Sequence, residues 1–102
     1  MARRQPTYAR IMRGRLKKPT LKEAIHQWSA YGPAYKASKG FRGAYLIVDS
    51  KTGEIQSITL WTNQAAMRAN ARTVLKATLG DFGRYFSRKP KPTHHRIRAA
   101  IE

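Results

Sequence analysis

The chain has 102 residues, which suits a single domain over residues 1–102 with one hydrophobic core and a flexible basic N-terminus at residues 1–6. It has no cysteine, which excludes disulfides and thiolate metal sites and fits a reducing cytoplasm. Residues 1–15 carry charges throughout and have no apolar core of signal-peptide length, so we expect a cytoplasmic protein. No segment approaches the roughly 20 apolar residues of a membrane span. Lys and Arg number 21 against 5 Asp and Glu, which gives a net charge of +16. This charge indicates either attraction to a polyanion or a solvated basic surface without such a partner, and it specifies neither a fold nor a reaction.

The first part of the chain predicts a strand followed by an interrupted helix. Residues 7–16 favour a strand, in which Gly14 marks a bulge or a close backbone approach. A helix then begins at Thr20, because Thr20 and Glu23 have the spacing of a capping box. Proline lacks the amide hydrogen that a helix needs, so Gly32-Pro33 should interrupt this helix and leave 34–38 as a separate short turn. The predicted apolar face of the helix consists of Leu21, Ala24, Ile25 and Trp28.

Two apolar runs around a tight turn predict a β-hairpin. Residues 41–48 and 55–61 are rich in aromatic and β-branched side chains, as is typical of strands. Between them, Thr52-Gly53 supplies the positive φ that a short loop between antiparallel strands requires.

The remaining residues predict a second helix and a last strand. Thr62 or Asn63 can cap the helix, and Gly80 is expected to end it. Residues 88–92 contain two prolines and are expected to form an extended, solvated connector to a strand over 93–101.

This order of elements predicts an α+β, ferredoxin-like split βαβ fold (βαββαβ), which is a four-stranded antiparallel sheet with two helices on one face. The helices leave the second face of the sheet open. Residues 41–48, however, are apolar at both odd and even positions, as expected of a strand that is buried on both sides. We therefore predict a homodimer whose two sheets pack face to face.

Residues 40–67 carry a characteristic set of landmarks. A Gly-Phe step leads into a strand, a Gly-aromatic-Leu run precedes an acidic turn, the next strand ends in tryptophan, and the following helix starts with small and polar residues. In this chain the landmarks are Gly40-Phe41, Gly43-Ala44-Tyr45-Leu46, Asp49, Trp61 and Asn63-Gln64-Ala65-Ala66-Met67. With them the segment resembles the centre of antibiotic biosynthesis monooxygenase-like domains, in the dimeric α/β-barrel superfamily. The resemblance implies a ferredoxin-like protomer, an obligate homodimer and a cavity between sheet and helices in each subunit.

What the resemblance implies about function is broader. The superfamily includes cofactor-independent oxygenases of polycyclic phenols, heme-degrading enzymes, isomerases and many domains with no known activity, so the fold does not dictate the chemistry. The function that the resemblance implies for this chain is a cofactor-independent oxygenase or a binder of an aromatic small molecule. Heme-degrading relatives combine an asparagine on the first strand, the tryptophan that ends the third strand, and a histidine about three helical turns later. This chain keeps Trp61, but it has Ala71 ten residues later and no asparagine within 7–16. Heme is therefore possible but disfavoured, and neither a cofactor nor a metal site is predicted.

Aromatic residues supply the candidate ligand pocket. A flat aromatic ligand needs apolar walls and a few polar groups that fix its orientation. The candidate wall residues are Trp61, Tyr45, Trp28 and Tyr31, although core packing explains all four equally well. Arg13 or Arg42 could anchor an acidic substituent on the ligand, and the sequence does not choose between them.

Two histidines are the candidate catalytic residues, because imidazole can transfer protons near neutral pH. His26 falls one step off the apolar face of the first helix, where an exposed helix residue is the alternative interpretation. His94 and His95 are adjacent on the last strand and should point to opposite faces. We take His95 as the second candidate, with ordinary strand packing as its alternative.

The alternative function is a nucleic-acid-binding or polyanion-binding dimer without catalytic activity. Lys and Arg neutralise phosphates with little sequence specificity, and the split βαβ fold also underlies RNA-recognition modules. The candidate contacts lie in and just after the first strand, at Arg10, Arg13, Arg15, Lys17 and Lys18.

Overall fold

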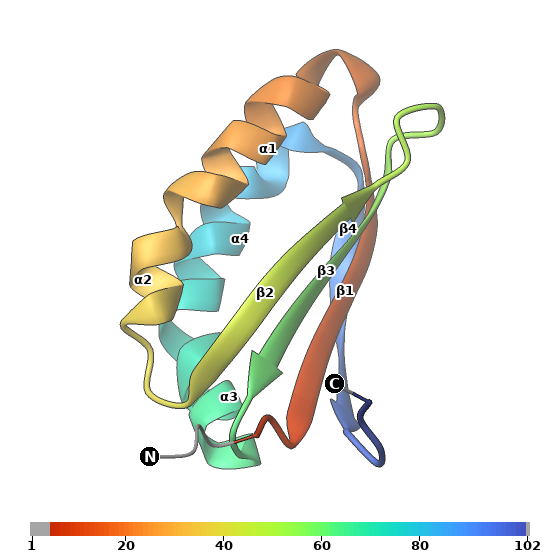
Figure 1. Cartoon of the computed structure of the whole chain (residues 1–102). Helices are drawn as coiled ribbons and strands as arrows, with labels where there is room; N and C mark the ends of the chain where they lie inside the picture. The colour runs from red at the N-terminus through yellow and green to blue at the C-terminus, as the bar shows by residue number, and fades with distance from the viewer. Residues whose placement is uncertain (1–4, 102) are drawn as a thin grey trace.

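A four-stranded antiparallel sheet with helices on one face makes up the protein (Figure 1). The computed structural model describes residues 5–101, so most of the predicted flexible N-terminus at 1–6 lies outside the described residues. The strands are β1 Tyr8–Leu16, β2 Phe41–Val48, β3 Glu54–Trp61 and β4 Phe86–Arg96. Their order in the sheet is β2-β3-β1-β4, which is the predicted ferredoxin-like arrangement.

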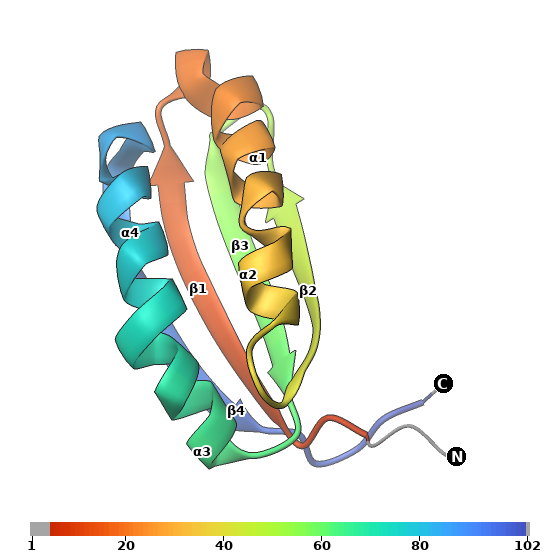
Figure 2. The same ribbon diagram turned by 90° about the vertical axis from the view of Figure 1, so that its left-hand side faces the viewer.

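Two helical segments cover the same face of this sheet, as Figure 2 shows. The first consists of a 3-10 turn Lys18–Thr20, α1 Leu21–Ala30 and α2 Gly32–Lys36. The second consists of α3 Gln64–Asn70, a π-helical turn Ala71–Leu75, α4 Lys76–Phe82 and a 3-10 turn Gly83–Tyr85. Within residues 5–101 there is no helix with the length and apolar character needed to cross a lipid bilayer.

Two glycines shape the strands as predicted. Gly53, in the turn between β2 and β3, has a φ of 82°, and the Asp49 side chain accepts hydrogen bonds from the backbone amides of Lys51 and Thr52 there. At Gly14 the register between β1 and β4 shifts, and a Cβ would lie 3.0 Å from the carbonyl oxygen of Arg88. The bulge and the close backbone approach are therefore both present.

The predicted helix starts are only partly confirmed. Asn63 caps α3, since its side-chain oxygen accepts a hydrogen bond from the amide of Ala66 at 2.8 Å. The predicted capping box at Thr20 is wrong, because the 3-10 turn precedes α1 and the Thr20 hydroxyl donates instead to the carbonyl of Lys17 at 2.6 Å. The helix is interrupted before Pro33 as predicted, since α1 ends at Ala30. The second piece, α2, starts at Gly32 rather than at residue 34, because proline is tolerated in the first turn of a helix.

Two predicted boundaries in the C-terminal half are wrong. Gly80 does not end the second helix, because α4 continues to Phe82, whose side chain is buried. The predicted connector at 88–92 belongs to β4, which starts at Phe86 and ends at Arg96 rather than spanning 93–101. Its prolines fit there because β4 pairs only with β1 and forms an edge of the sheet.

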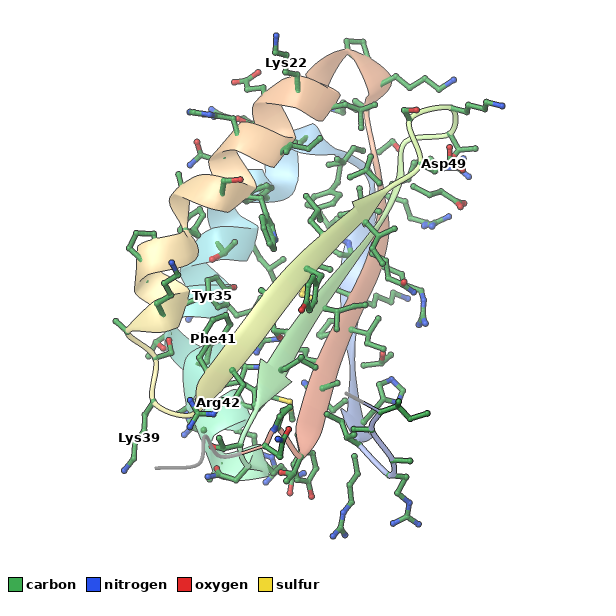
Figure 3. The ribbon with its side chains drawn as sticks, in the orientation of Figure 1. Lys22, Tyr35, Lys39, Phe41, Arg42 and Asp49 are labelled. Carbon is green, nitrogen blue, oxygen red and sulfur yellow. The ribbon has the colours of Figure 1, made fainter. Side chains whose placement is uncertain are left out.

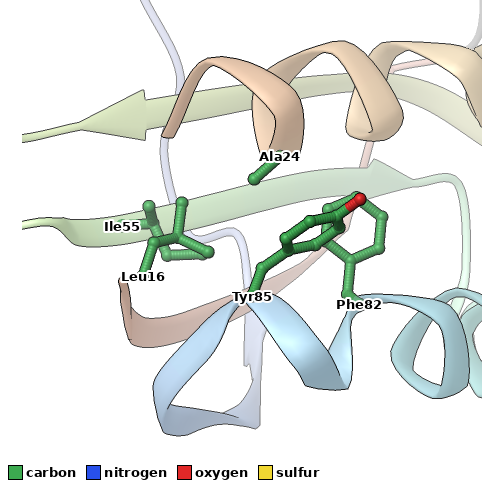
Figure 4. Packing of buried hydrophobic residues seen from close by; sticks show 5 residues of the cluster. All are labelled: Leu16, Ala24, Ile55, Phe82 and Tyr85. Atoms are coloured by element: carbon green, nitrogen blue, oxygen red, sulfur yellow. The ribbon is translucent and has the colours of Figure 1, made fainter. Parts of the chain in front are cut away.

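The hydrophobic core lies where the end of β1 and the start of β3 meet α1 and the end of α4 (Figure 4). Its buried residues are Leu16, Ala24, Ile55, Phe82 and Tyr85. From the predicted apolar face of the first helix, Leu21 and Trp28 also pack against this cluster. Ile25 does not, since it is exposed. The cluster holds α1 and α4 to one end of the sheet.

Candidate functional site

A cavity of about 540 Å³ lies between the helices and the sheet, on the side of α2. This volume is in the range of small-molecule sites. The wall has apolar, polar and cationic members, chiefly Met12, Trp28, Phe41 and Leu75, then Tyr35, Ser57 and Thr59, and finally Arg10, Lys36 and Arg42. Figure 3 shows the side chains of Tyr35 and Phe41 between α2 and β2, with Arg42 at the start of β2.

Arg10 is the most deeply buried charged group of this cavity. It lies on the helix side of β1 and is only 1% exposed. Its guanidinium donates a hydrogen bond from Nη2 to Asn70 Oδ1 at 2.8 Å, and Cζ lies 5.4 Å from the centroid of the Trp61 ring. Its Nε has no hydrogen-bond partner. A permanent cation is thus held in the wall by the Asn70 amide, by the Trp61 ring and, at 3.5 Å from Nη1, by the carbonyl of Met67.

A second set of hydrogen bonds positions the groups around Arg10. Asn70, at the end of α3, donates from Nδ2 to Ser38 Oγ at 3.0 Å and so links the second helical segment to the loop before β2. The buried Trp61 donates from Nε1 to Thr59 Oγ1 at 2.9 Å. These bonds occupy the polar groups behind the cavity wall and fix the orientation of the Arg10 side chain.

The cavity has an unbalanced positive charge. Its three cations are accompanied by no carboxylate among the described residues that line it. The acids of residues 5–101 are Glu23, Asp49, Glu54 and Asp81, which bond to Tyr85, the hairpin turn, Arg15 and Tyr31. Burial lowers the pKa of Arg10, and nearby Tyr35 partly offsets this, but a guanidinium remains charged at neutral pH. The Nε of Arg42 is also buried without a partner.

The predicted aromatic pocket is only partly assembled. Trp28 lines the cavity, and Trp61 lies directly behind Arg10 with none of its surface exposed. Tyr31 packs against Phe82, with ring centroids 6.0 Å apart, and is not part of the cavity wall. Tyr45 pairs with Ile58 on the opposite face of the sheet, where it is 62% exposed. The four side chains therefore do not form a single pocket.

Neither candidate histidine lies in the cavity wall. His26 is exposed on α1, and His95 is exposed on β4, where its Nε2 lies 2.9 Å from Thr93 Oγ1. His94, which pairs with Arg10 across β1 and β4, has a pKa below that of a free histidine, because partial burial and then the charges of Arg10 and Arg68 disfavour its protonated form.

The five predicted polyanion contacts do not share a surface. Arg10 is buried on the helix side, so it is not available at the outer surface. Arg13 and Arg15 alternate with it on β1 and point to the open face, where Arg15 forms a 2.9 Å ion pair with Glu54. Lys17 and Lys18 are exposed in the turn after β1.

The cavity includes residues that the sequence interpretation did not place there. The sequence pattern places neither Tyr35 nor Phe41 in the pocket, although Phe41 is one of the landmarks of the resemblance, and it places Arg10 on an outer surface. For Arg10 the signal was its position, because it alternates in step with Met12 and Leu16 on β1 and therefore shares their buried face. Of the two arginines considered as anchors for an acidic group, Arg42 lies in the cavity wall and Arg13 does not.

Comparisons with known proteins rest on structure, since no protein-family profile and no curated protein matches the sequence. A protein of unknown function from Nitrosomonas europaea superposes with a TM-score of 0.81 at 13% identity, over 98% of this chain and 97% of that one. The ActVA-Orf6 monooxygenase of Streptomyces coelicolor, solved with the ligand nanaomycin D, gives 0.80 at 14% identity over 95% and 92%.

SnoaB of Streptomyces nogalater, a cofactor-independent oxygenase, gives a TM-score of 0.75 at 13% identity over 94% of this chain and 97% of that one. Structures provisionally assigned as antibiotic biosynthesis monooxygenases, from Bordetella bronchiseptica and Nitrosomonas europaea, superpose similarly at TM-scores of 0.78. The chain therefore has the ferredoxin-like fold that structures of antibiotic biosynthesis monooxygenases share.

Proposed function

We propose that the protein is a homodimer that binds a flat aromatic molecule in the cavity between helices and sheet and oxygenates it without a cofactor. The observation that carries the proposal is the cavity itself, with a volume of about 540 Å³ and walls that include Trp28, Phe41 and Met12. Apolar walls with a few polar groups suit an aromatic ring system. The fold shared with a cofactor-independent oxygenase supports the reaction class.

The reaction is testable with a dihydroxynaphthalene as substrate. Oxygenation to the hydroxynaphthoquinone consumes one dioxygen molecule, whose second oxygen atom leaves as water with two hydrogens of the substrate. No external reductant is required. We expect the protein to accelerate dioxygen uptake and the appearance of quinone absorbance together. Binding of the substrate without dioxygen uptake would reduce the proposal to a binding protein.

A variant that fills the cavity tests the location of the site. Ala44 lines the cavity from β2, and Ala44→Phe should weaken binding of the aromatic probe at least about tenfold, because the added ring occupies the space of the ligand. Ala77→Phe is the matched control, since Ala77 is exposed on α4 outside the cavity wall. Calorimetric titration of both variants measures the difference. Equal binding by the two would place the ligand elsewhere.

Polyanion binding is the second candidate, favoured by the strand at the sheet edge. β4 is exposed along most of its length, and its exposed cations are Arg88, Lys89, Lys91 and Arg96. A row of cations at a sheet edge can follow a phosphate backbone. This surface differs from the one that the sequence suggested around the first strand.

A pair of double variants separates a β4 site from diffuse charge. Lys89→Gln with Lys91→Gln should weaken binding of a single-stranded oligonucleotide and reduce the slope of log affinity against log salt by about 0.7 for each lysine removed. Lys22→Gln with Lys76→Gln removes the same charge from exposed positions on α1 and α4. Fluorescence anisotropy over a salt series gives both slopes. The same loss in the two double variants would mean attraction by net charge alone.

A further inference from the structure

The charge of the cavity defines the ligand more closely than its apolar walls do. Arg10 is 1% exposed, and its guanidinium donates to Asn70 Oδ1 and, at 3.5 Å, to the carbonyl of Met67. The side chain of Tyr35 also interacts with it, but no carboxylate of residues 5–101 is bonded to it. A buried cation without a counter-charge destabilises the folded state unless something compensates it. An anion in the cavity would supply that compensation.

Arg42 is a second cation in the cavity wall whose Nε lacks a hydrogen-bond partner. It lies in the bulge where β2 pairs irregularly with β3, between Phe41 and Gly43, and it lines the same cavity as Arg10. In each of the two guanidinium groups the Nε hydrogen has no acceptor. The exposed Lys36 adds a third positive charge from α2. Two planar groups with free donors match the two oxygens of a planar carboxylate.

We propose that the natural ligand is an aromatic carboxylate, whose ring system lies against the apolar walls and whose carboxylate neutralises Arg10 and Arg42. The inference rests on the proposed small-molecule function and adds the chemical class of the ligand to it. A neutral aromatic compound would fill the same walls but would leave the buried charge uncompensated. The site therefore selects for the carboxylate, and selection rather than overall affinity is the property to measure.

Naphthoate and naphthamide are suitable probes because they share a ring system and differ in charge. In calorimetric titrations of the unsubstituted protein at neutral pH, naphthoate should bind at least about tenfold more tightly than naphthamide, as expected when charge-assisted hydrogen bonds are gained. Arg10→Met removes the buried charge while keeping an unbranched apolar side chain, and Arg42→Gln removes the second one. Each variant should reduce the preference for naphthoate to about twofold or less while retaining naphthamide binding.

Lys39→Gln is the matched control for net charge. Lys39 is exposed in the loop before β2, points away from the body of the molecule and does not line the cavity (Figure 3). It should keep the full preference for naphthoate. Equal loss of preference in Lys39→Gln and Arg42→Gln would overturn the proposal in favour of surface attraction.

The remaining outcomes separate this inference from the function on which it rests. If the unsubstituted protein binds both probes equally, the anion site is wrong and the aromatic cavity stands. If it binds neither probe, both proposals fail. The comparison of the two probes uses the unsubstituted protein, so it remains valid even if the Arg10 variant does not fold. Arg42→Gln provides a second variant, because Arg42 is only half-buried.

Discussion

Gly40 fixes the loop between α2 and β2, the two elements that carry the cavity residues Lys36 and Phe41. Its φ is 82°, and its carbonyl accepts a hydrogen bond from the amide of Thr62 at 2.8 Å. A Cβ there would lie 2.5 Å from the Cβ of Ala66 and 2.8 Å from the hydroxyl of Thr62. We expect Gly40→Ala to lower the free energy of unfolding by about 2–4 kcal/mol, because an unfavourable backbone conformation and a steric clash act together.

Gly80→Ala is the control for this prediction. Gly80 lies within α4, has no positive φ, and a Cβ there would meet nothing within 4 Å. Alanine should therefore raise the free energy of unfolding by about 0.5–1 kcal/mol through its higher helix propensity. Urea denaturation should show that the free energy of unfolding falls in Gly40→Ala and rises in Gly80→Ala. Destabilisation of both variants would contradict it.

His94 gives the protein a specific dependence on pH. Its pKa in the folded chain lies below the ordinary value of about 6.5, so below that pH the unfolded chain binds a proton that the folded chain resists. Stability contributed by neutral His94 is therefore complete above about pH 6.5 and is lost as the pH falls toward the lowered pKa. Thermal unfolding measured between neutral and mildly acidic pH should show this loss, and His94→Gln should reduce it. An identical pH profile for the variant would argue against the assignment to His94.

The strands and helices were predictable where the signal is local. The hairpin from β2 to β3 follows from Gly53 and its apolar flanks, and the order of elements follows from the alternation of strand and helix patterns. The errors occurred where tertiary contacts override local preference. Gly80 stays helical because buried Phe82 and Leu75 hold the second helical segment against the sheet. The prolines of β4 stay in a strand because they lie at a sheet edge.

The site was less predictable than the fold, because the alternation of side chains along a strand does not tell which of them face the helices and which face the open side of the sheet. Residues 41–48 are apolar on both faces, so the sequence could not decide that Tyr45 points away from the helices while Trp61 on β3 points toward them. Arg10 presented the opposite difficulty. Its charge suggested a surface position, whereas the apolar residues that share its face of β1 bury it.

The open face of the sheet is where we expect two copies of the molecule to meet. Tyr45 and Ile47 are 62% and 54% exposed there, and the pairing of β1, β3 and β2 aligns Ile11 and Ile58 beside them. A sheet face of this kind is unfavourable in water and is buried when two sheets pack. The helices cover only the other face (Figure 1), so a second copy of the chain can reach the open one.

The net charge of +16 should make the association of the expected dimer depend on salt in the opposite direction from polyanion binding. Two strongly cationic protomers repel each other, and added salt screens the repulsion, so sedimentation equilibrium should give tighter dimers as the salt concentration rises. Oligonucleotide binding should weaken over the same range.

Ile47→Lys should dissociate the dimer at micromolar concentration, because it places a charge in the packed face. Ile25→Lys adds the same charge at a residue that is 40% exposed on α1, and it should leave the dimer intact. A monomeric unsubstituted protein at every salt concentration would refute the dimer, and the exposed apolar face would then require a different partner.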